Sequence, residues 1–334
     1  MQEFKDIEQT TAARPDAGAA GTRWNGRRYY PISQYFRQHF GRRIAKISVS
    51  VADQCPNRRP GSSLEQCIFC DEWASAAYPR EAHRLLTEQI RHNKTLVSRR
   101  YKNCDYLVYF QAYTNTLDKI ADLEQRYRTA LAEPGVKGLV IGTRPDCLPR
   151  RVVKLLNRLA QDHYIMVELG VQSFDDAQLA YMKRGHTRAQ NIQGIQLLGA
   201  ETKVDIGVHL IFGLPDETEE SIIDTARQIN QLPVHNVKLH NLHVLKNTEL
   251  ERLYRAGRFV PDSLDTYADK VILFLRHLSP DISLQRLAGL ASRWDELVAP
   301  AWTTQKMQPI EFIEQRMREL DVWQGDLAVD ATQS

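Results

Sequence analysis

The sequence lacks the segments that would direct a chain into or across a membrane. Residues 1–22 are polar and contain no apolar stretch of the kind that forms the core of a secretory signal. No run of about 20 apolar residues, the length needed to span a bilayer, occurs anywhere. We therefore expect a cytoplasmic protein with no membrane partner. Residues 1–22 also carry few large apolar side chains, so the sequence predicts a disordered tail there.

Cysteine is scarce, and a strong net charge is absent. The 334 residues include five cysteines, an odd number, and a reducing compartment disfavours disulfides. Three of them, Cys55, Cys67 and Cys70, lie within the segment CPNRRPGSSLEQCIFC. Clustered cysteines in such a compartment indicate metal binding or catalysis. The formal net charge of +3 is too small to predict nucleic-acid binding from charge alone.

Apolar runs of strand length alternate with helical segments along the chain. The runs cover residues 44–51, 105–111, 138–143, 164–170, 204–212 and 236–243. The segments between them place apolar residues three and four positions apart, the spacing of an amphipathic helix. This alternation predicts an α/β fold with a parallel sheet, either a barrel or a doubly wound layer. The pattern turns mostly helical after residue 247, so we expect a core at 23–246 and a helical extension at 247–334.

A polar loop follows each of the expected strands. In chain order the loops read CPNRR, QAYTNT, GTRPD, ELGVQS, FGLPDET and LHNLH. In parallel α/β folds the carboxyl ends of the strands meet on one rim, where ligands bind. Each loop by itself is more typical of an ordinary turn between a strand and a helix. Together on one rim, they predict a binding site.

Two kinds of metal centre fit the cysteine spacing. Two residues separate Cys67 from Cys70, so both sulfurs can reach one centre, and Cys55 adds a third ligand. Structural zinc needs a fourth ligand from elsewhere in the chain. The candidates for it are His83, Cys104 and Cys147. An iron–sulfur cluster is also held by thiolates, and a four-iron cluster with three cysteines leaves one iron open for chemistry. The spacing leaves both centres open.

The motifs resemble those of a known family. The three cysteines, ending in Cys-x-aromatic-Cys after the first strand, are similar to those of the radical S-adenosylmethionine (SAM) superfamily. More narrowly, the chain resembles the bacterial YhcC-like group, in the branch related to the catalytic subunit of eukaryotic Elongator. The segments that carry this resemblance are RYYPISQYFRQHFGRRIAKIS, CPNR, YFQAYTNT, IGTRPDCLP, ELGVQS, RGH, GLPDET, KLHNLHV, LQRLAGLA, LVAPAW and WQG. Eleven residues separate Cys55 from Cys67, one fewer than is usual in that group.

The resemblance implies an enzyme with a partial (β/α)6 TIM-type barrel of the radical SAM type and a helical C-terminal extension. Such enzymes bind a [4Fe-4S] cluster through three cysteines, here Cys55, Cys67 and Cys70, and bind S-adenosyl-L-methionine at the fourth iron. One electron, from a donor such as flavodoxin or ferredoxin, cleaves SAM to methionine and a 5′-deoxyadenosyl radical that abstracts hydrogen from the substrate. The protein orients the reactants and excludes competing reactions.

The resemblance also implies a set of SAM contacts on the rim. Glu168 and Gln172 are expected to bind ribose or carboxylate oxygens, and Arg184 is expected to pair with the methionine carboxylate. The residues expected beside the methionine amino group, the adenosyl group and the cluster are Thr114, Asn115, His209, Leu214 and Phe69. Without the resemblance, Arg184 would be interpreted as half of a surface ion pair and His209 as a core histidine.

The segment 23–43 has the composition of an RNA contact. It contains six arginines, six aromatic residues and no acidic residue, a combination that suits phosphate contacts and base stacking. The alternative is a helix whose aromatic residues pack on the barrel. The Elongator-like branch acts on the wobble uridine of tRNA, so the resemblance implies tRNA modification. The expected RNA contacts are Arg27, Arg28, Arg42 and Arg43.

Two other functions fit the same residues. One is a radical SAM enzyme that acts on a small metabolite or peptide. The other is a zinc-stabilised RNA-binding protein without catalytic activity. The sequence identifies neither the substrate atom that is attacked nor a catalytic acid or base.

Overall fold

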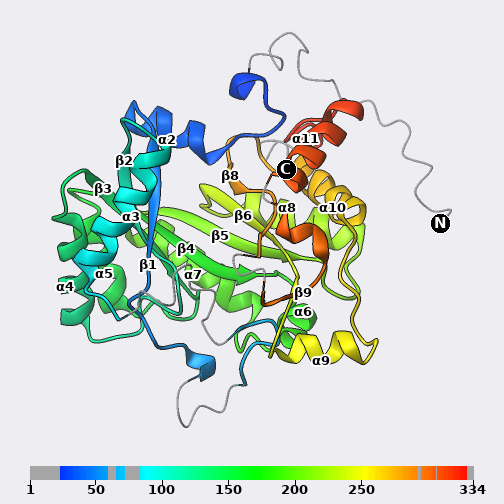
Figure 1. The fold of residues 1–334 in the computed structure, drawn as a ribbon, viewed down its shortest axis with the longest axis horizontal. Coiled ribbons are helices and arrows are strands. Elements are labelled where there is room, and N and C mark those ends of the chain that lie inside the picture. Colours follow the sequence, from blue (N-terminus) through cyan, green and yellow to red (C-terminus); the bar gives the residue numbers. More distant parts are fainter. Residues whose placement is uncertain (1–22, 59–64, 72–82, 292–294, 306, 329–334) are drawn as a thin grey trace.

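The computed structural model describes residues 23–58, 65–71, 83–291, 295–305 and 307–328. Residues 1–22, predicted to be a tail, lie outside these ranges. A seven-stranded parallel sheet runs through the centre in the order β1-β2-β3-β4-β5-β6-β8, with helices around it (Figure 1). The predicted α/β partial barrel is confirmed, with one strand more than the sequence predicts.

Six of the strands coincide closely with the predicted runs. The strands of the sheet are β1 (Ile44–Val49), β2 (Asp105–Phe110), β3 (Val136–Thr143), β4 (Tyr164–Gln172), β5 (Asp205–Phe212), β6 (Asn236–Asn241) and β8 (Ser283–Arg286). The helices between them are α3 (Leu86–Arg100), α4 (Ile120–Leu131), α5 (Arg150–Leu159), α6 (Asp176–Tyr181), α7 (Arg188–Glu201) and α8 (Glu219–Asn230). Thr187 and Thr218 cap α7 and α8 by accepting a backbone N–H with the side chain, which fixes where these helices begin. No helix in the described ranges is long and apolar enough to cross a bilayer.

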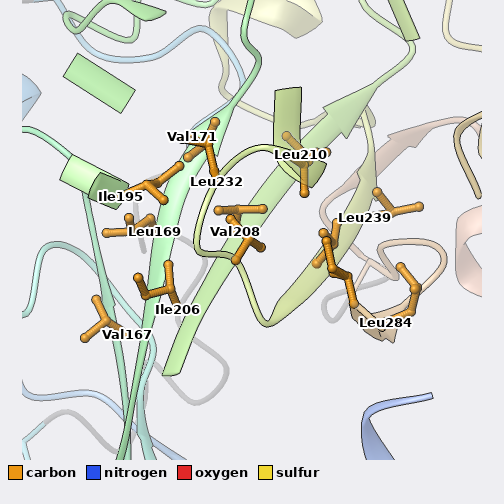
Figure 2. Close-up of a cluster of buried hydrophobic side chains, with 14 of the residues drawn as sticks. Val167, Leu169, Val171, Ile195, Ile206, Val208, Leu210, Leu232, Leu239 and Leu284 are labelled. Carbon is orange, nitrogen blue, oxygen red and sulfur yellow. The ribbon is translucent and has the colours of Figure 1, made fainter. Parts of the chain in front are cut away.

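Side chains along the strands alternate between two faces of the sheet. On β4, Val167 and Leu169 belong to the outer apolar core, whereas Glu168 between them lines the interior of the barrel. Figure 2 shows the outer core, where side chains of β4, β5, β6 and β8 gather with Ile195 of α7 and Leu232. Because successive side chains of a strand point to opposite faces, the apolar residues hold the helices and the inner face is free to carry polar groups.

Helix α2 (Ile32–Phe40) closes the barrel at the end where the strands begin. It packs against both edge strands, β1 and β8, and lies at the top of Figure 1. Phe36 on this helix is buried against Leu107, Val140 and Met166, which come from β2, β3 and β4. The helix therefore covers the apolar layer at this end of the barrel.

The sheet has two free edges, because β1 and β8 do not pair with each other in the described sheet. We call this gap the seam. Side chains bridge it, since Lys46 Nζ of β1 donates to Gln285 Oε1 of β8. On the β8 side, the Leu284 N–H donates to the Tyr30 carbonyl at 2.7 Å, just before α2 begins. The barrel is therefore closed by side chains and by α2.

The chain after residue 247 does more than form helices. It contains α9 (Glu249–Arg255), α10 (Leu264–His277) and α11 (Gln308–Glu319). It also adds β8 to the sheet, and β9 (Leu297–Ala299) pairs with β7 (Val244–Leu245) as a separate antiparallel ribbon. These strands are two to four residues long, too short for a period of two to be visible in the sequence.

Candidate metal and cofactor site

A cavity of about 300 Å³ lies inside the barrel toward the carboxyl ends of the strands. The three clustered cysteines Cys55, Cys67 and Cys70 all line it. The predicted cofactor residues that also line it are Phe69, Thr114, Glu168, Gln172, Arg184 and His209. Asn115 and Leu214 do not. The structure thus brings the three predicted metal ligands and six of the eight predicted cofactor residues to one place.

The cysteine segment folds around Asn57, in the short turn η2 (Pro56–Arg58). Its Nδ2 donates to the carbonyls of Glu65 at 2.9 Å and Lys183 at 2.7 Å. Its Oδ1 accepts from Arg144 at the end of β3. One buried side chain thereby ties both halves of the cysteine segment to β3 and to the turn after α6.

Two arginines donate to cysteine sulfurs. The Cys70 N–H donates to the Cys67 carbonyl at 3.1 Å, which closes the turn between these two cysteines. Arg184 Nη1 lies 3.3 Å from Cys67 Sγ, and Arg58 Nη2 lies 3.2 Å from Cys70 Sγ. Burial raises the pKa of the Cys70 thiol to about 12, and the Arg58 charge opposes that rise. The arginines supply the positive charge that buried thiolates need.

The arrangement of the cysteines suits a cluster. Among the residues that the structure describes, no three Cys, His, Asp or Glu side chains form a group able to hold a metal ion. Cys55, Cys67 and Cys70 line one cavity but do not form such a group. In a four-iron cluster each cysteine binds a different iron, so its ligands need not converge. A single zinc ion would require that convergence.

Arg184 connects the cysteine segment to β4. Its Nη2 donates to the Gly170 carbonyl at 3.0 Å, and its Nε is buried without a partner in the described chain. A Cβ on Gly170 would lie 2.9 Å from Gln172 Nε2 and 3.3 Å from Arg184 Nη2, so a side chain there would crowd both. Glycine lets these two polar groups lie against the strand, with one donor of Arg184 left for a ligand.

Glu168 is the centre of a buried ionic network that we call the charged layer. Its Oε1 accepts from Lys46 Nζ at 3.0 Å. Its Oε2 accepts from Lys238 Nζ at 3.0 Å and from His209 Nε2 at 2.6 Å. Lys238 also donates to the Tyr109 hydroxyl at 2.8 Å. The predicted ribose acceptor is thus already engaged by three side chains from β1, β5 and β6.

Burial and mutual charge shift the pKa values in the charged layer. Burial by itself raises the pKa of Glu168, but Lys238, Lys46 and His209 outweigh it and hold that pKa well below its usual range. Burial lowers the pKa of Lys238 to about 7 against the attraction of Glu168. Burial and Lys238 lower the pKa of His209 to about 4. Near pH 7, therefore, Glu168 is charged and His209 is neutral.

Asn115 and Leu214 have structural contacts instead of a place in the cavity. Asn115 Nδ2 donates to three backbone carbonyls at 2.9 to 3.0 Å, which fixes the turn after β2. Leu214 packs with Ile68 and Phe69 in an apolar cluster beside the cysteine segment. Both residues support loops of the rim, and their predicted contacts with SAM find no support in the lining of the cavity.

The segment 23–43 lies at the opposite end of the barrel from the cysteines. Trp24, Tyr29 and Phe36 are buried, as the packing alternative predicts for the aromatic residues. The four arginines predicted to contact RNA all contact the protein. These contacts are ion pairs from Arg27 to Glu314, from Arg28 to Asp321 and from Arg42 to Asp105, and a cation–π contact from Arg43 to Tyr101. Because Arg42 and Arg43 directly precede β1 and Cys55 follows it, roughly 20 Å of strand separates them.

Several polar residues of the barrel interior were not predicted from the sequence. They are Lys46, Tyr109, Arg144, Lys238, His240, His243 and Arg286. A visible pattern could have found one of them. Lys238 lies between Val237 and Leu239 in NVKLHN, and both neighbours belong to the outer apolar core. A charged residue between outward apolar neighbours in a strand must face the other side of the sheet, which here is the barrel interior.

Comparison with known protein families decides the class. Residues 49–229, more than half of the chain, match the model of the Radical SAM superfamily. Residues 234–319 match the Radical_SAM C-terminal domain. The chain belongs to the radical SAM superfamily.

Individual relatives agree with this assignment. Protein YhcC of Escherichia coli (strain K12) is 33% identical over 266 residues, which are 79% of this chain and 84% of that protein. A tRNA uridine(34) acetyltransferase of Methanocaldococcus jannaschii is 28% identical over 152 residues, which are 45% of this chain and 27% of that protein. The structure of the archaeal Methanocaldococcus infernus Elp3 with an N-terminal deletion has a similar fold, with a TM-score of 0.61 at 17% identity. That match covers 84% of this chain and 64% of the Elp3 chain, less than two thirds of it.

Membership in the radical SAM superfamily establishes the general chemistry. Enzymes of this superfamily use a [4Fe-4S] cluster and SAM, and they need an electron donor. The predicted family, enzyme class and cofactors are therefore confirmed. The zinc-stabilised, non-catalytic alternative is not supported.

Proposed function

We propose that Cys55, Cys67 and Cys70 bind the [4Fe-4S] cluster and that the cavity beside them binds SAM. The observation that carries this proposal is that the three cysteines and six expected SAM contacts line the same cavity. The arginine donors at Cys67 and Cys70 favour thiolates, the form that binds iron. When bound, the cluster and SAM supply a 5′-deoxyadenosyl radical, with one electron from a donor such as flavodoxin or ferredoxin.

The residues of the chain would orient SAM. The unpartnered Nε of Arg184 is suited to the methionine carboxylate. The Thr114 N–H donates to the Gln54 carbonyl at 3.1 Å, which fixes the loop after β2 beside the cysteine segment and leaves the hydroxyl for the methionine amino group. Gln172, the last residue of β4, and His209, within β5, would flank the adenosyl group. Phe69, packed beside the same cavity, would exclude water from the cluster.

We further propose that the substrate is tRNA, modified at the wobble uridine. This is supported by the similarity to a tRNA uridine(34) acetyltransferase over 152 residues, which include part of the radical SAM region. It is also supported by the arginines at 27, 28, 42 and 43. The Arg42 side chain remains half exposed despite its ion pair, so a phosphate could reach it.

The test is anaerobic reconstitution of the cluster, followed by measurement of 5′-deoxyadenosine with and without bulk tRNA. If tRNA is the substrate, it should increase 5′-deoxyadenosine formation and acquire a change at uridine 34 that mass spectrometry detects. Ribonuclease-treated tRNA is the control. Formation of 5′-deoxyadenosine that tRNA does not alter would refute the tRNA proposal and leave the cofactor proposal intact.

A small metabolite is the second candidate substrate. The observation that favours it is the separation between the predicted RNA contacts and the cavity, which lie at opposite ends of β1. The cavity is also lined by charged side chains, which suit a small polar molecule. In this case small acids would stimulate 5′-deoxyadenosine formation and tRNA would not.

A further inference from the structure

The cavity carries more basic than acidic groups. Its lining includes five basic side chains, those of Arg58, Arg144, Arg184, Lys238 and Arg286, and two acidic ones, those of Asp71 and Glu168. Four of the basic groups have local partners: Arg58 and Arg184 donate to cysteine sulfurs, Arg144 pairs with Asp146, and Lys238 pairs with Glu168. Arg286 is the exception.

Arg286 has a backbone contact but no carboxylate partner. It ends β8, next to Lys238 of β6 in the sheet, and its Nε donates to the Leu239 carbonyl at 3.1 Å. In the described part of the chain it forms no ion pair, and its two Nη groups make no hydrogen bond. Burial lowers its pKa, yet a guanidinium remains charged at any pH where the protein is folded. Glu168 attracts the guanidinium without a direct contact, and it is already engaged by Lys46, Lys238 and His209. A buried cation without a direct ion pair is costly, so this group is suited to a negatively charged ligand.

Two further groups that line the cavity with Arg286 have a buried nitrogen without a partner in the described part of the chain. Asn241 at the end of β6 accepts from the Gly289 N–H at 3.0 Å through its Oδ1, while its Nδ2 is buried and unbonded in the described chain. His243 Nδ1 is likewise buried without a partner there. Burial and Arg286 lower the pKa of His243 to about 4, so its ring is neutral and carries one N–H. Both residues line the same cavity as Arg286.

We propose that Arg286, Asn241 and His243 form an oxyanion subsite that binds a carboxylate or phosphate group of the substrate. Arg286 and Asn241 offer N–H donors toward the cavity, and His243 adds one in the tautomer protonated at Nδ1. A guanidinium with two free Nη groups matches the paired oxygens of these anions. The proposal rests on the proposed function, because it assigns the cysteine side of the cavity to the cluster and SAM. It leaves the β6 and β8 side to the substrate.

The Arg286 subsite is distinct from the expected place of the SAM carboxylate. Arg184, which we assign to that carboxylate, contacts Cys67 and Gly170 on β4. Arg286 lies on β8, and β4, β5, β6 and β8 follow one another in the sheet. Arg184 would therefore bind the SAM carboxylate, and Arg286 would bind the anionic group of the substrate.

The test measures anion binding to the reconstituted full-length protein without relying on turnover. Inorganic phosphate and acetate are titrated by calorimetry under anaerobic conditions, with SAM absent and with SAM at saturation. Arg286→Met should lower the affinity for at least one of these probes about tenfold or more and leave SAM affinity and iron content unchanged. Arg150→Met, at an exposed arginine that pairs with Glu201 outside the cavity, is the matched control and should bind as the wild type does.

A second variant keeps the test decisive if Arg286→Met folds poorly. Asn241→Asp retains the acceptor for the Gly289 N–H but adds a negative charge, so it should also reduce probe binding. Probe binding that both variants retain would overturn the proposal and leave the cofactor proposal standing. A loss of SAM affinity equal to the loss of probe affinity would also overturn it, because Arg286 would then hold the SAM carboxylate. Competition by tRNA would identify the anion as a nucleic-acid phosphate, and its absence would identify a small acid.

Discussion

The five cysteines differ in their surroundings more than in their burial. Cys67, Cys104 and Cys147 are all buried. Cys67 lines the cavity and receives an N–H from Arg184. Cys104, at the start of β2, donates to the Tyr101 carbonyl at 3.4 Å, at the far end of the barrel. Burial raises the pKa of Cys147 to about 12, as it does that of Cys70, but Cys147 does not line the cavity. Of these three buried cysteines, Cys67 is the one that both lines the cavity and receives a guanidinium N–H at its sulfur.

Alanine at Cys55, Cys67 or Cys70 should therefore abolish the cluster. Wild-type protein and Cys104→Ala should each contain about four irons per chain after anaerobic reconstitution. Iron analysis and the visible absorption of the brown protein measure this. Cys104→Ala is the matched control, because it removes a buried thiol by the same substitution. Equal iron loss in all four variants would contradict the assignment.

Lys238 makes stability depend on pH in a specific window. Burial lowers its pKa to about 7, against 10.5 in the unfolded chain, so between these values the unfolded chain holds a proton that the folded chain lacks. Stability should then rise with pH through this window, by up to about 1.4 kcal/mol per pH unit. Lys238→Met removes this contribution. Denaturant unfolding at pH 7, 8 and 9 should show that the free energy of unfolding rises more steeply with pH in the wild type than in the variant.

An unchanged difference between the two proteins from pH 7 to pH 9 would show that the Lys238 ammonium stays charged throughout. Glu168 does not complicate the comparison, because its pKa lies well below this window. Residues that titrate in both proteins cancel in the difference.

Most of the predicted site residues lie in loops or at strand ends, whereas Glu168 and His209, inside β4 and β5, were predicted from the resemblance. Cys67, Gln172 and Arg184 stand in polar loops or at strand ends, where the sequence changes character. Lys238 lies between apolar neighbours inside β6, and Arg286 follows the polar Gln285 in β8, so neither lies in a polar loop at a strand end. That both line one cavity with the cysteines became visible only in the folded barrel, because contacts between distant strands are not encoded in local spacing.

At the scale of elements, α2 covers the end of the barrel where the strands begin. Phe36 is 3% exposed and is surrounded by inward side chains of three strands. Phe36→Ala should lower the free energy of unfolding by about 3–5 kcal/mol, since it removes a buried ring that neighbouring strands cannot move to replace. Arg37→Ala, an exposed position on the same helix, should change it by less than about 0.5 kcal/mol. Chemical denaturation measures both. Similar free energies of unfolding for Phe36→Ala and Arg37→Ala would mean that the packing of α2 at this end does not contribute to stability.

The long elements were predicted well and the short ones were not. The runs at 105–111 and 204–212 became β2 (Asp105–Phe110) and β5 (Asp205–Phe212), because six to eight residues show the apolar pattern clearly. The four residues of β8 include Gln285 and Arg286, whose polar character hides the strand. Pairing with β6 makes this segment extended, and such tertiary context is absent from the local sequence.

At the scale of the whole molecule, the arginine segment and the cavity occupy opposite ends of the barrel. If tRNA contacts both, replacing Arg42 and Arg43 with alanine should weaken tRNA binding and make its dependence on salt shallower. Each lost phosphate contact lowers the slope of log affinity against log salt by about 0.7–0.9. Filter binding at several salt concentrations measures the slope. Arg150→Ala, an exposed arginine on α5, is the control, and a slope that the double variant leaves unchanged would remove these arginines from the RNA proposal.

The seam between β1 and β8 affects how fast the backbone amide hydrogens of each strand exchange with solvent. β4 and β5 have a strand on each side, whereas β1 has only β2. An amide in a central strand exchanges with solvent only when its neighbour separates, but a strand with one neighbour opens with fewer broken bonds. Hydrogen–deuterium exchange should therefore be slowest in β4 and β5 and faster in β1, the strand that leads into the cysteine segment. The polypeptide that carries Cys55 would then be attached to one of the two edge strands, which open more readily than the central ones, so insertion of the cluster need not disturb the rest of the barrel.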